Sequence, residues 1–217
     1  MTDFAAQRRN MVDGQVRTAD VTDLRILTAM LEVPRERFVP ASCAALAYLD
    51  RDLPVGVGGR RRLLKPMVLG KLLQAAAVGP ADRVLDVGCA AGYAAAVLSR
   101  IAGTVVALDD DEGLLAIARP ELSACANVTL VQGPLEAGWP AQGPYDVILV
   151  EGASEVAPDA LCRQLKDGGR LVCVEGAGPG AKAMLYLRSG DDIGGRPLFD
   201  ASAAILPGFA KRPDFAF

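Results

Sequence analysis

The sequence predicts an α/β fold, in which a mostly parallel, doubly wound sheet follows an N-terminal helical extension. After residue 79, short apolar segments alternate with helical segments, which is the order that strand–helix–strand units produce. The apolar segments are rich in Val, Ile and Leu without polar alternation, as in strands covered on both faces. Residues 1–79 lack this alternation and carry apolar side chains at helical spacing. The chain therefore combines a helical part with a layered α/β part.

The N-terminal part is expected to hold three helices and one loop. Helical spacing of apolar residues predicts a helix over residues 5–16 and a second from Thr22, whose side chain suits an N-cap, to residue 31. Residues 53–65 contain Pro, several Gly and a run of basic side chains, which predicts a loop. A third helix is predicted over residues 66–77, because Pro is favoured in the first helical turn.

The α/β part is expected to contain five parallel strands, with two further strands closing the sheet. The parallel strands are predicted at residues 83–87, 104–108, 128–131, 145–150 and 170–174. Helices are predicted between them at residues 93–101, 111–119 and 158–165, the last ended by Gly168-Gly169. Residues 184–187 and 197–205 are expected to form the closing strands, in antiparallel orientation.

Composition excludes several classes of function. The chain has 217 residues, of which 51% are hydrophobic and none is His, so Ser-His-Asp and Cys-His nucleophile systems are excluded. A His-ligated metal is excluded too, and no metal site is expected. The net charge of −3 gives no reason to expect nucleic acid or membrane as a partner. Five cysteines without a Cys-x-x-Cys pair and no apolar run long enough for a membrane span predict free thiols in a cytoplasmic protein.

A loop of small residues follows the first predicted strand and opens a helix. It reads Gly88-Cys89-Ala90-Ala91-Gly92-Tyr93, directly after Asp86-Val87. In open α/β sheets, ligands bind at the carboxyl ends of the strands, and small residues let the backbone approach them closely. The carboxylate of Asp86 is placed to meet an ammonium group. The candidate cofactor contacts in this segment are Asp86, Gly88, Cys89, Ala90, Gly92 and Tyr93.

Acidic residues follow the second predicted strand. Asp109 lies about 20 residues after the small-residue loop, the spacing at which an acid accepts hydrogen bonds from ribose hydroxyls. Asp110 is a further candidate cofactor contact, and Asp111 suits a helix N-cap. The alternative is that all three are solvated acids at a helix N-terminus, stabilised by the helix dipole.

The spacing of the loop distinguishes between nucleotide cofactors. A dinucleotide site has the pattern G-x-G-x-x-G, whereas residues 88–92 read G-x-A-x-G. This spacing is similar to the loop of class I methyltransferases that binds S-adenosylmethionine (SAM), with Ala90 in place of the middle glycine. The resemblance implies a Rossmann-like class I SAM-dependent methyltransferase with SAM as the cofactor.

Further blocks resemble the protein-L-isoaspartate (D-aspartate) O-methyltransferase family. The similarity covers roughly residues 9–176, and its blocks are specific in combination. Residues 35–40 and 47–56 resemble the N-terminal blocks of that family, residues 84–98 its loop and helix, residues 145–150 its fourth strand, and residues 164–172 its Q-L-x-x-G-G-x-L-V block.

The resemblance implies a protein-repair reaction. Members of the family transfer the SAM methyl group to the carboxylate of an isoaspartyl residue in damaged peptides. A carboxylate is ionised at neutral pH and needs no general base, which suits a chain without histidine. Residues 1–79 then form an N-terminal helical extension with a substrate loop, and residues 80–217 the SAM-binding domain of one compact unit.

The predicted substrate loop departs from the family. The family carries a G-Q-T-I-S-Q-P-like segment whose serine is associated with activity, and alignment on Pro66 puts Leu64 at the serine and Arg62 at the threonine. The catalytic residue is therefore unknown. Arg62 and Lys65 are candidates for binding a substrate carboxylate. The alternatives for the basic run, which begins Arg60-Arg61, are a solvated flexible loop or a nucleic-acid patch.

A second departure follows the third predicted strand. The family has G-D-G where this chain has Gly133-Pro134-Leu135, so the acid expected near the adenine is missing. Leu135 stays a candidate cofactor contact, and Glu136 is a possible replacement for the acid.

Two other functions stay open at this point. One is methylation of a different acidic or small-molecule substrate, and the other is SAM binding without catalysis. The sequence predicts that Asp109→Ala weakens SAM binding and that Leu64→Ser raises isoaspartyl methylation.

Overall fold

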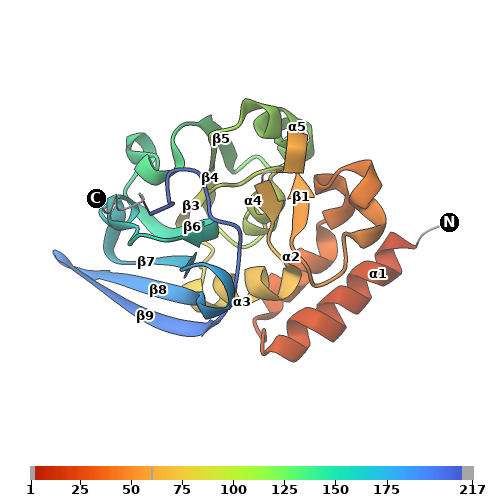
Figure 1. Cartoon of the computed structure of the whole chain (residues 1–217), viewed down its shortest axis with the longest axis horizontal. Helices are drawn as coiled ribbons and strands as arrows, with labels where there is room; N and C mark the ends of the chain where they lie inside the picture. The colour runs from red at the N-terminus through yellow and green to blue at the C-terminus, as the bar shows by residue number, and fades with distance from the viewer. Residues whose placement is uncertain (1–2, 60, 212–217) are drawn as a thin grey trace, which may run out of the picture.

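The computed structural model describes residues 3–59 and 61–211, which form an α/β structure around one large sheet (Figure 1). The strand order in this seven-stranded sheet is β5-β4-β3-β6-β7-β8-β9. Strands β3 to β7 are mutually parallel where they pair, and β8 and β9 are antiparallel to their neighbours. The predicted fold class and the antiparallel closing strands are confirmed. The strands are β3 (Arg83–Val87), β4 (Thr104–Asp109), β5 (Val128–Gln132), β6 (Tyr145–Ser154), β7 (Leu165–Glu175), β8 (Lys182–Ser189) and β9 (Asp192–Asp200).

Both faces of the sheet are covered. Successive residues of a strand point to opposite faces, and the buried side chains accordingly divide into two clusters. One cluster contains Val105 and Ala107 of β4 together with the N-terminal helices, and the other contains Val106 and Leu108. The helices of the α/β part are α3 (Pro66–Ala76), α4 (Tyr93–Leu98), α5 (Glu112–Leu122) and α6 (Asp159–Cys162), with short helices η6 (Leu135–Ala137), η7 (Pro140–Gln142) and η8 (Gly178–Gly180).

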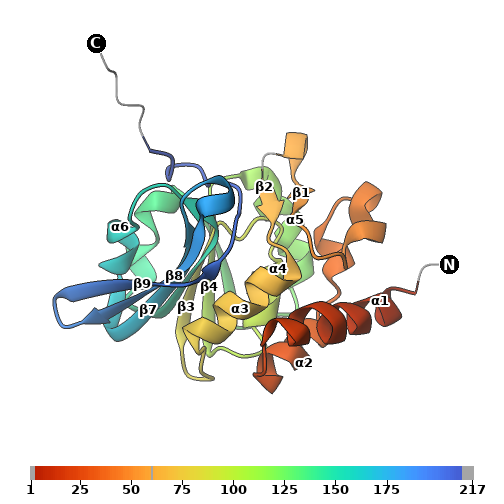
Figure 2. The same ribbon diagram turned by 60° about the horizontal axis from the view of Figure 1, so that its bottom comes forward.

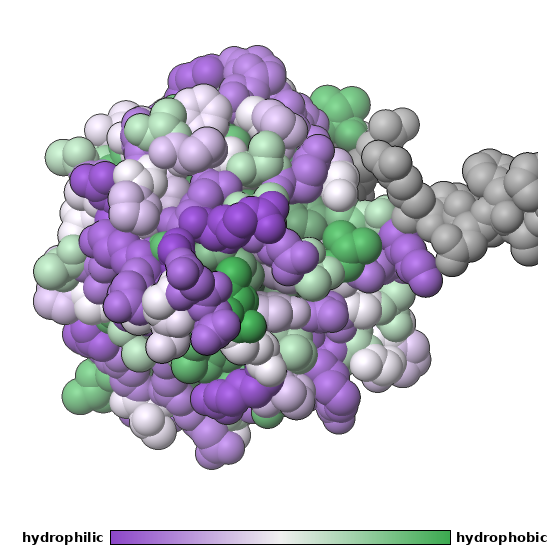
Figure 3. All heavy atoms as spheres, turned by 90° about the vertical axis from the view of Figure 1, so that its left-hand side faces the viewer, coloured by the Kyte–Doolittle hydropathy of each residue, from purple (hydrophilic) through white to green (hydrophobic). Residues whose placement is uncertain are grey.

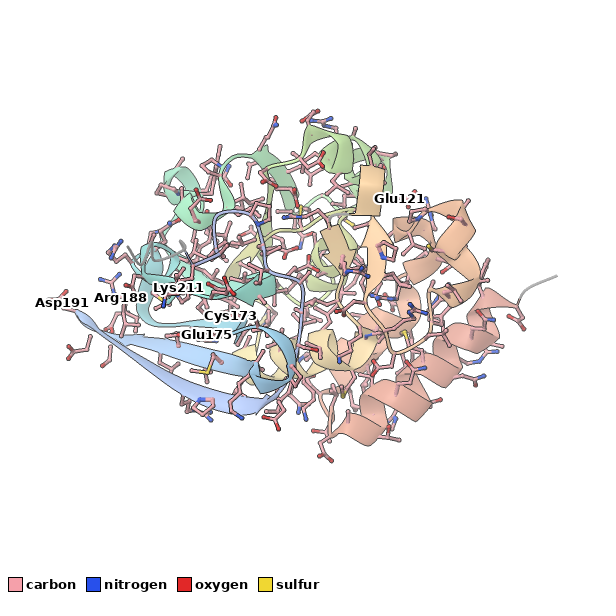
Figure 4. The ribbon with its side chains drawn as sticks, in the orientation of Figure 1. Glu121, Cys173, Glu175, Arg188, Asp191 and Lys211 are labelled. Atoms are coloured by element: carbon pink, nitrogen blue, oxygen red, sulfur yellow. The ribbon has the colours of Figure 1, made fainter. Side chains whose placement is uncertain are left out.

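The N-terminal part packs against one face of the sheet. Figure 2 shows α1 and α2 beside α3, away from strands β7 to β9. Figure 4 labels Glu121 on α5, where its carboxylate forms an ion pair of 2.7 Å with Arg37 of the N-terminal part. The elements of this part are α1 (Phe4–Met11), η1 (Val12–Val16), η2 (Arg17–Ala19), α2 (Leu24–Glu32), η3 (Arg35–Phe38), η4 (Ala41–Leu46), β1 (Leu53–Val55), η5 (Val57–Gly59) and β2 (Arg61–Leu63).

The predicted loop over residues 53–65 is wrong. Strands β1 and β2 pair as an antiparallel hairpin, with Leu53 opposite Leu63 and Val55 opposite Arg61. Gly58 and Gly59 lie in its turn and Arg62 on its outer face, whereas Arg61 lies on its inner face. Burial of alternate side chains on the inner face holds the hairpin in place, which local composition does not reveal.

Other differences concern the ends of elements. Helix α2 is capped by Asp23, whose side chain accepts a hydrogen bond from the Arg25 N–H, and not by Thr22. Helix α6 spans only Asp159–Cys162, and Gly168-Gly169 lies within β7 at a register shift, so these glycines do not end the helix. Strand β9 ends at Asp200, five residues before the predicted end at residue 205.

The segment of residues 201–211 crosses the carboxyl end of β6. The Ala153 N–H donates to the Ala204 carbonyl (2.8 Å), and the Leu206 N–H donates to the Ala153 carbonyl (3.0 Å). A side chain added at Gly88 or Gly152 would meet the Leu206 side chain within about 3.0 Å. Leu206 therefore lies directly over the small-residue loop.

The surface and the cysteines are unremarkable for a globular chain. Figure 3 shows a mainly hydrophilic face on the side of β8 and β9, with apolar residues in small patches. All five cysteines are free, and three of them are buried. No helix among residues 3–59 and 61–211 is long and apolar enough to cross a membrane.

Candidate cofactor and active site

The small-residue loop joins the carboxyl end of β3 to the start of α4. Three of its residues have positive φ angles: Gly88 (80°), Ala90 (49°) and Gly92 (92°). A Cβ atom at Gly92 would lie 2.8 Å from the Leu122 side chain, so a larger residue would not fit. The N–H groups of Gly88 and Cys89 both donate to the Leu108 carbonyl, at 2.8 and 3.1 Å. The loop is thus tied to the end of the neighbouring strand β4.

Asp109, at the end of β4, holds this loop in place through a hydrogen bond to its backbone. Its carboxylate is fully buried and accepts hydrogen bonds from the N–H groups of Ala90 (2.8 Å) and Asp111 (3.0 Å). Asp111 caps α5, as the sequence predicted, because its side chain accepts hydrogen bonds from Gly113 and Leu114. The alternative of a solvated acid is therefore wrong for Asp109, whereas Asp110 is exposed at the rim.

Two more buried carboxyl groups lie on the same face of the sheet. Asp86 lies two residues after Val84 in β3, and Glu151 lies two residues after Leu149 in β6, so each acid points to the same face of the sheet as that residue. Val84 and Leu149 belong to the buried cluster that also contains Ala107 of β4. Both are at most 2% exposed. Both Asp86 oxygens and Glu151 Oε1 accept no hydrogen bond from an N–H or hydroxyl group among the described residues, and the two carboxyl groups lie within hydrogen-bond reach of each other. Three acids thus converge at the carboxyl ends of adjacent strands, and two of them pair only with each other.

Burial perturbs the titration of this cluster. Removal from water raises the pKa of Asp86 to about 7; the hydrogen bond with the Glu151 carboxyl lowers this pKa in part, and the Asp109 carboxylate raises it further. Burial and the neighbouring Asp86 raise the pKa of Glu151 well above its usual range. The pKa of Asp109 is also raised by burial, although Arg61 counteracts part of that shift. A cationic ligand would therefore stabilise the ionised form of these acids.

The sequence reasoning did not select Glu151. The signal was present, because Glu151 follows the predicted strand 145–150 as Asp109 follows 104–108. Three parallel strands that end at one edge bring their terminal side chains together.

A cation from the β1–β2 hairpin enters this acid cluster. The Arg61 guanidinium is 6% exposed and forms an ion pair with the Asp109 carboxylate through Nη2. Its Nη1 lies 3.7 Å from Asp110 and makes no hydrogen bond among the described residues. Nη2 also lies 3.4 Å from the position of a Cβ atom at Gly88. The hairpin therefore reaches the small-residue loop itself.

The remaining hairpin residues follow the alternation of a strand. Arg62 is exposed, and Lys65 is half-buried with its backbone N–H bonded to Asp52 (2.8 Å). Leu64 is buried in the main hydrophobic cluster. The structure thus brings Arg61, rather than Arg62 or Lys65, to the acids. The prediction of a solvated loop is wrong for Arg61 and Leu64, and Arg60 lies outside the described residues.

Arg35 is a second buried arginine beside the site. Its Nε donates to the Ala47 carbonyl (2.8 Å), and its Nη2 donates to the Leu64 carbonyl (2.7 Å). The guanidinium stacks 4.7 Å from the ring centroid of Tyr93, the first residue of α4. Arg35 therefore joins the position of Leu64 to the cofactor helix.

The other residues predicted to contact the cofactor do not belong to the acid cluster. Cys89 is buried, and burial raises the pKa of its thiol well above the usual range, so it is not a nucleophile. Leu135 is buried in the cluster on the opposite face of the sheet. Glu136 is exposed, and its carboxylate lies against Gly208.

An apolar cavity of about 210 Å³ adjoins the loop. Its lining includes Pro40, Val55, Ala91 and Ile117, which belong to the N-terminal part, the hairpin, the small-residue loop and α5. The cavity therefore lies where the two parts of the chain meet.

Comparison with known proteins identifies the family. The sequence model of the Protein-L-isoaspartate(D-aspartate) O-methyltransferase (PCMT) family matches residues 6–192. The chain is 43% identical over 192 residues to Protein-L-isoaspartate O-methyltransferase of Methylorubrum extorquens (strain PA1), which covers 88% of this chain and 83% of the relative. It is 38% identical over 190 residues to the protein of the same name from Koribacter versatilis (strain Ellin345), covering 87% of this chain and 84% of the relative.

Solved structures agree with this assignment. A protein-L-isoaspartate O-methyltransferase superposes with a TM-score of 0.79 at 26% identity, covering 93% of this chain and 66% of that chain. A putative protein-L-isoaspartate O-methyltransferase from Plasmodium falciparum, solved with S-adenosyl-L-homocysteine, has the same fold, with a TM-score of 0.76 at 17% identity and coverage of 92% and 97%. The chain belongs to the protein-L-isoaspartate(D-aspartate) O-methyltransferase family, whose members are SAM-dependent O-methyltransferases.

Proposed function

We propose that the acid cluster at the carboxyl ends of β3, β4 and β6 binds SAM, and that the chain uses it to methylate isoaspartyl carboxylates in peptides and proteins. Family membership supports the reaction. The observation that carries the site is the buried pair of carboxyl groups of Asp86 and Glu151 beside the small-residue loop, whose oxygens accept no hydrogen bond from an N–H or hydroxyl group among the described residues.

The chemistry of these acids fits SAM. The cofactor carries an ammonium and a sulfonium, and buried carboxylates require compensating positive charge. A dinucleotide would bring a pyrophosphate, which three neighbouring acids would repel. The residues therefore suit a cationic nucleoside, in agreement with the G-x-A-x-G spacing.

We assign the parts of the cofactor by position along the sheet edge. Asp86 and Glu151 would hold the ammonium, Asp109 the ribose hydroxyls, and the backbone of Gly88 to Ala90 would lie against the nucleoside. Tyr93 would support α4 through its buried ring, and Gly92 would allow α4 to start close to the ligand. Cys89, Asp110 and Leu135 stay predicted contacts.

Methyl transfer needs little acid–base chemistry from the chain. SAM supplies an electrophilic methyl group on a sulfonium. A C–O bond to the substrate carboxylate forms as the C–S bond breaks, the electron pair stays on sulfur, and no proton moves. The chain has to orient the carboxylate and exclude water, which Leu206 over Gly88 and the buried Leu64 are placed to do.

The substrate is a peptide or protein carboxylate. The relatives give no support to a small-molecule substrate or to an inactive SAM-binding protein. Arg62 and Lys65, at the surface of the hairpin, stay candidate contacts for the substrate. The absence of nucleic-acid binding and a cytoplasmic location also stay predictions.

Methyl transfer from labelled SAM to a synthetic isoaspartyl peptide tests the proposal. The matched control is the same peptide with a normal aspartyl residue. Labelling of the isoaspartyl peptide alone is expected. Equal labelling of both peptides, or of neither while calorimetry shows SAM bound, would contradict the proposed substrate.

A further inference from the structure

Arg61 and the cofactor require the same carboxylate. Asp109 Oδ2 accepts a hydrogen bond from the Ala90 N–H and is ion-paired with Arg61, Oδ1 accepts from the Asp111 N–H, and the side chain has no exposed surface. A ribose hydroxyl can bind this carboxylate only where Arg61 gives up its place. The Ala90 and Asp111 contacts hold the loop and α5 together, which leaves Arg61 as the exchangeable partner.

We propose that Arg61 exchanges partners during the reaction: the ribose of SAM displaces it from Asp109, and the freed guanidinium binds the carboxylate of the isoaspartyl substrate. This inference rests on the proposed function. It makes cofactor and substrate binding mutually dependent, since Arg61 becomes available to the substrate only after SAM takes Asp109.

The hairpin is built to allow such an exchange. Strands β1 and β2 have three residues each and pair only with one another. The turn between them contains Gly58 and Gly59, both with positive φ, and Val57 is 96% exposed. Arg61 lies at the turn end of β2, next to this turn, so its side chain can leave Asp109 while Leu53 and Leu63 stay in the core. Displacement of Arg61 therefore does not require the sheet to move.

The freed guanidinium has a suitable partner in the substrate. Arg61 Nη1 makes no hydrogen bond among the described residues, and guanidinium groups bind carboxylates through two parallel hydrogen bonds. Arg35, which is also buried near this edge, has an Nη1 without a hydrogen bond as well, but its Nε and Nη2 are fixed on backbone carbonyls. Arg61 is also three residues from Leu64, the position aligned with the family's serine. It is therefore the better placed cation for an incoming carboxylate.

The experiment compares Arg61→Gln with Arg196→Gln, which removes an exposed arginine of β9 away from the hairpin. Calorimetry measures the affinity of each full-length protein for S-adenosyl-L-homocysteine (SAH), and fluorescence anisotropy measures binding of a labelled isoaspartyl peptide with and without SAH. SAH is used because it carries the ribose and cannot transfer a methyl group.

Arg61→Gln is expected to bind SAH about 10-fold more tightly, because the competitor for Asp109 is gone. In the wild type, SAH is expected to strengthen peptide binding by about the same factor, and Arg61→Gln is expected to lose this coupling. Arg196→Gln is expected to behave like the wild type in both titrations. If Arg61→Gln does not fold, Arg61→Lys, which retains the charge without the planar fork, carries the same test with smaller changes.

Two results would overturn the exchange. One is unchanged or weaker SAH binding by the Arg61 variants, which a merely structural role would produce. The other is coupling between SAH and peptide that survives the substitution. Failure of the proposed function is seen separately, as a wild type that binds SAM and peptide but transfers no methyl group.

Discussion

The two buried arginines beside the cofactor loop differ in their partners. Arg35, in η3 of the N-terminal part, binds two backbone carbonyls and stacks on Tyr93. Arg61, in β2 of the hairpin, binds the carboxylate of Asp109. No ligand can replace Arg35 on those carbonyls without unfolding the segments that carry them, whereas a hydroxyl can replace Arg61 on a carboxylate.

The comparison separates a structural arginine from an exchangeable one. Both side chains are almost completely buried, so burial does not distinguish them. The acceptor groups distinguish them. Arg35 binds backbone carbonyls, whose positions are fixed by the fold, whereas Arg61 binds a carboxylate that can bind a ligand instead. Substitutions of the arginines or of the residues around them test this distinction.

Asp109→Ala is expected to have the largest effect. It removes the predicted ribose acceptor, leaves Arg61 buried without its ion pair, and frees the Ala90 and Asp111 N–H groups. SAM affinity is expected to fall about 100-fold, and the free energy of unfolding by about 3–5 kcal/mol. Calorimetry and urea denaturation measure these changes, with Asp191→Ala, in the exposed turn between β8 and β9, as the control. Unchanged SAM affinity would remove Asp109 from the cofactor site.

Arg35→Met is expected to lower the free energy of unfolding by about 2–4 kcal/mol. Two buried carbonyl acceptors lose their donor, and the cation–π contact with Tyr93 is lost. Saturating SAH is not expected to recover this loss beyond the stabilisation it gives the wild type, whereas it should recover most of any loss in Arg61→Gln. Urea denaturation with and without SAH measures both variants. Equal recovery in both would erase the distinction between the two arginines.

Leu64→Ser tests whether the hairpin retains the family's geometry. Because Leu64 is 2% exposed, the smaller polar side chain is expected to lower the free energy of unfolding by about 2–3 kcal/mol. The rate of isoaspartyl methylation is expected to rise about 10-fold, since a hydroxyl donor returns to the serine position. Single-turnover labelling at a temperature where the variant is folded measures the rate. No increase would mean that the hairpin has moved this position away from the reacting carboxylate.

The pH dependence of stability is expected to give the smallest effect. The pKa of Asp86 is raised by burial from its usual value to about 7, so the folded state binds a proton that the unfolded state releases between about pH 4 and about pH 7. The stability that this proton provides is lost as the pH rises through about 7, on the order of 2 kcal/mol.

Urea denaturation at about pH 5 and about pH 8 measures that loss, and Asp86→Asn is expected to reduce it, while the raised pKa of Glu151 keeps part of the pH dependence. SAM binding is expected to strengthen as the pH rises towards about 7, because the ammonium replaces the proton. A wild-type loss no larger than that of Asp86→Asn would show that Asp86 is ionised throughout.

The cofactor edge could be predicted because its signals are local. A Val-rich strand, a loop of small residues and a helix follow one another within residues 83–98, and Asp109 ends the next strand. Strand boundaries there agree with the prediction within one residue for β3, β4 and β5. The hairpin could not be predicted in the same way, because its two strands of three residues are shorter than any periodic pattern can identify.

Sequence patterns were sufficient to predict the fold class, the parallel sheet, the small-residue loop and the family to which the chain belongs. Each follows from contiguous residues whose spacing dictates a local structure. The tertiary structure alone decided that Arg61 lies inside while Arg62 lies outside, and that Glu151 joins Asp86 and Asp109. The physical reason is that a strand presents alternate residues to opposite faces, and only its pairing partner and the core beneath it decide which face is buried.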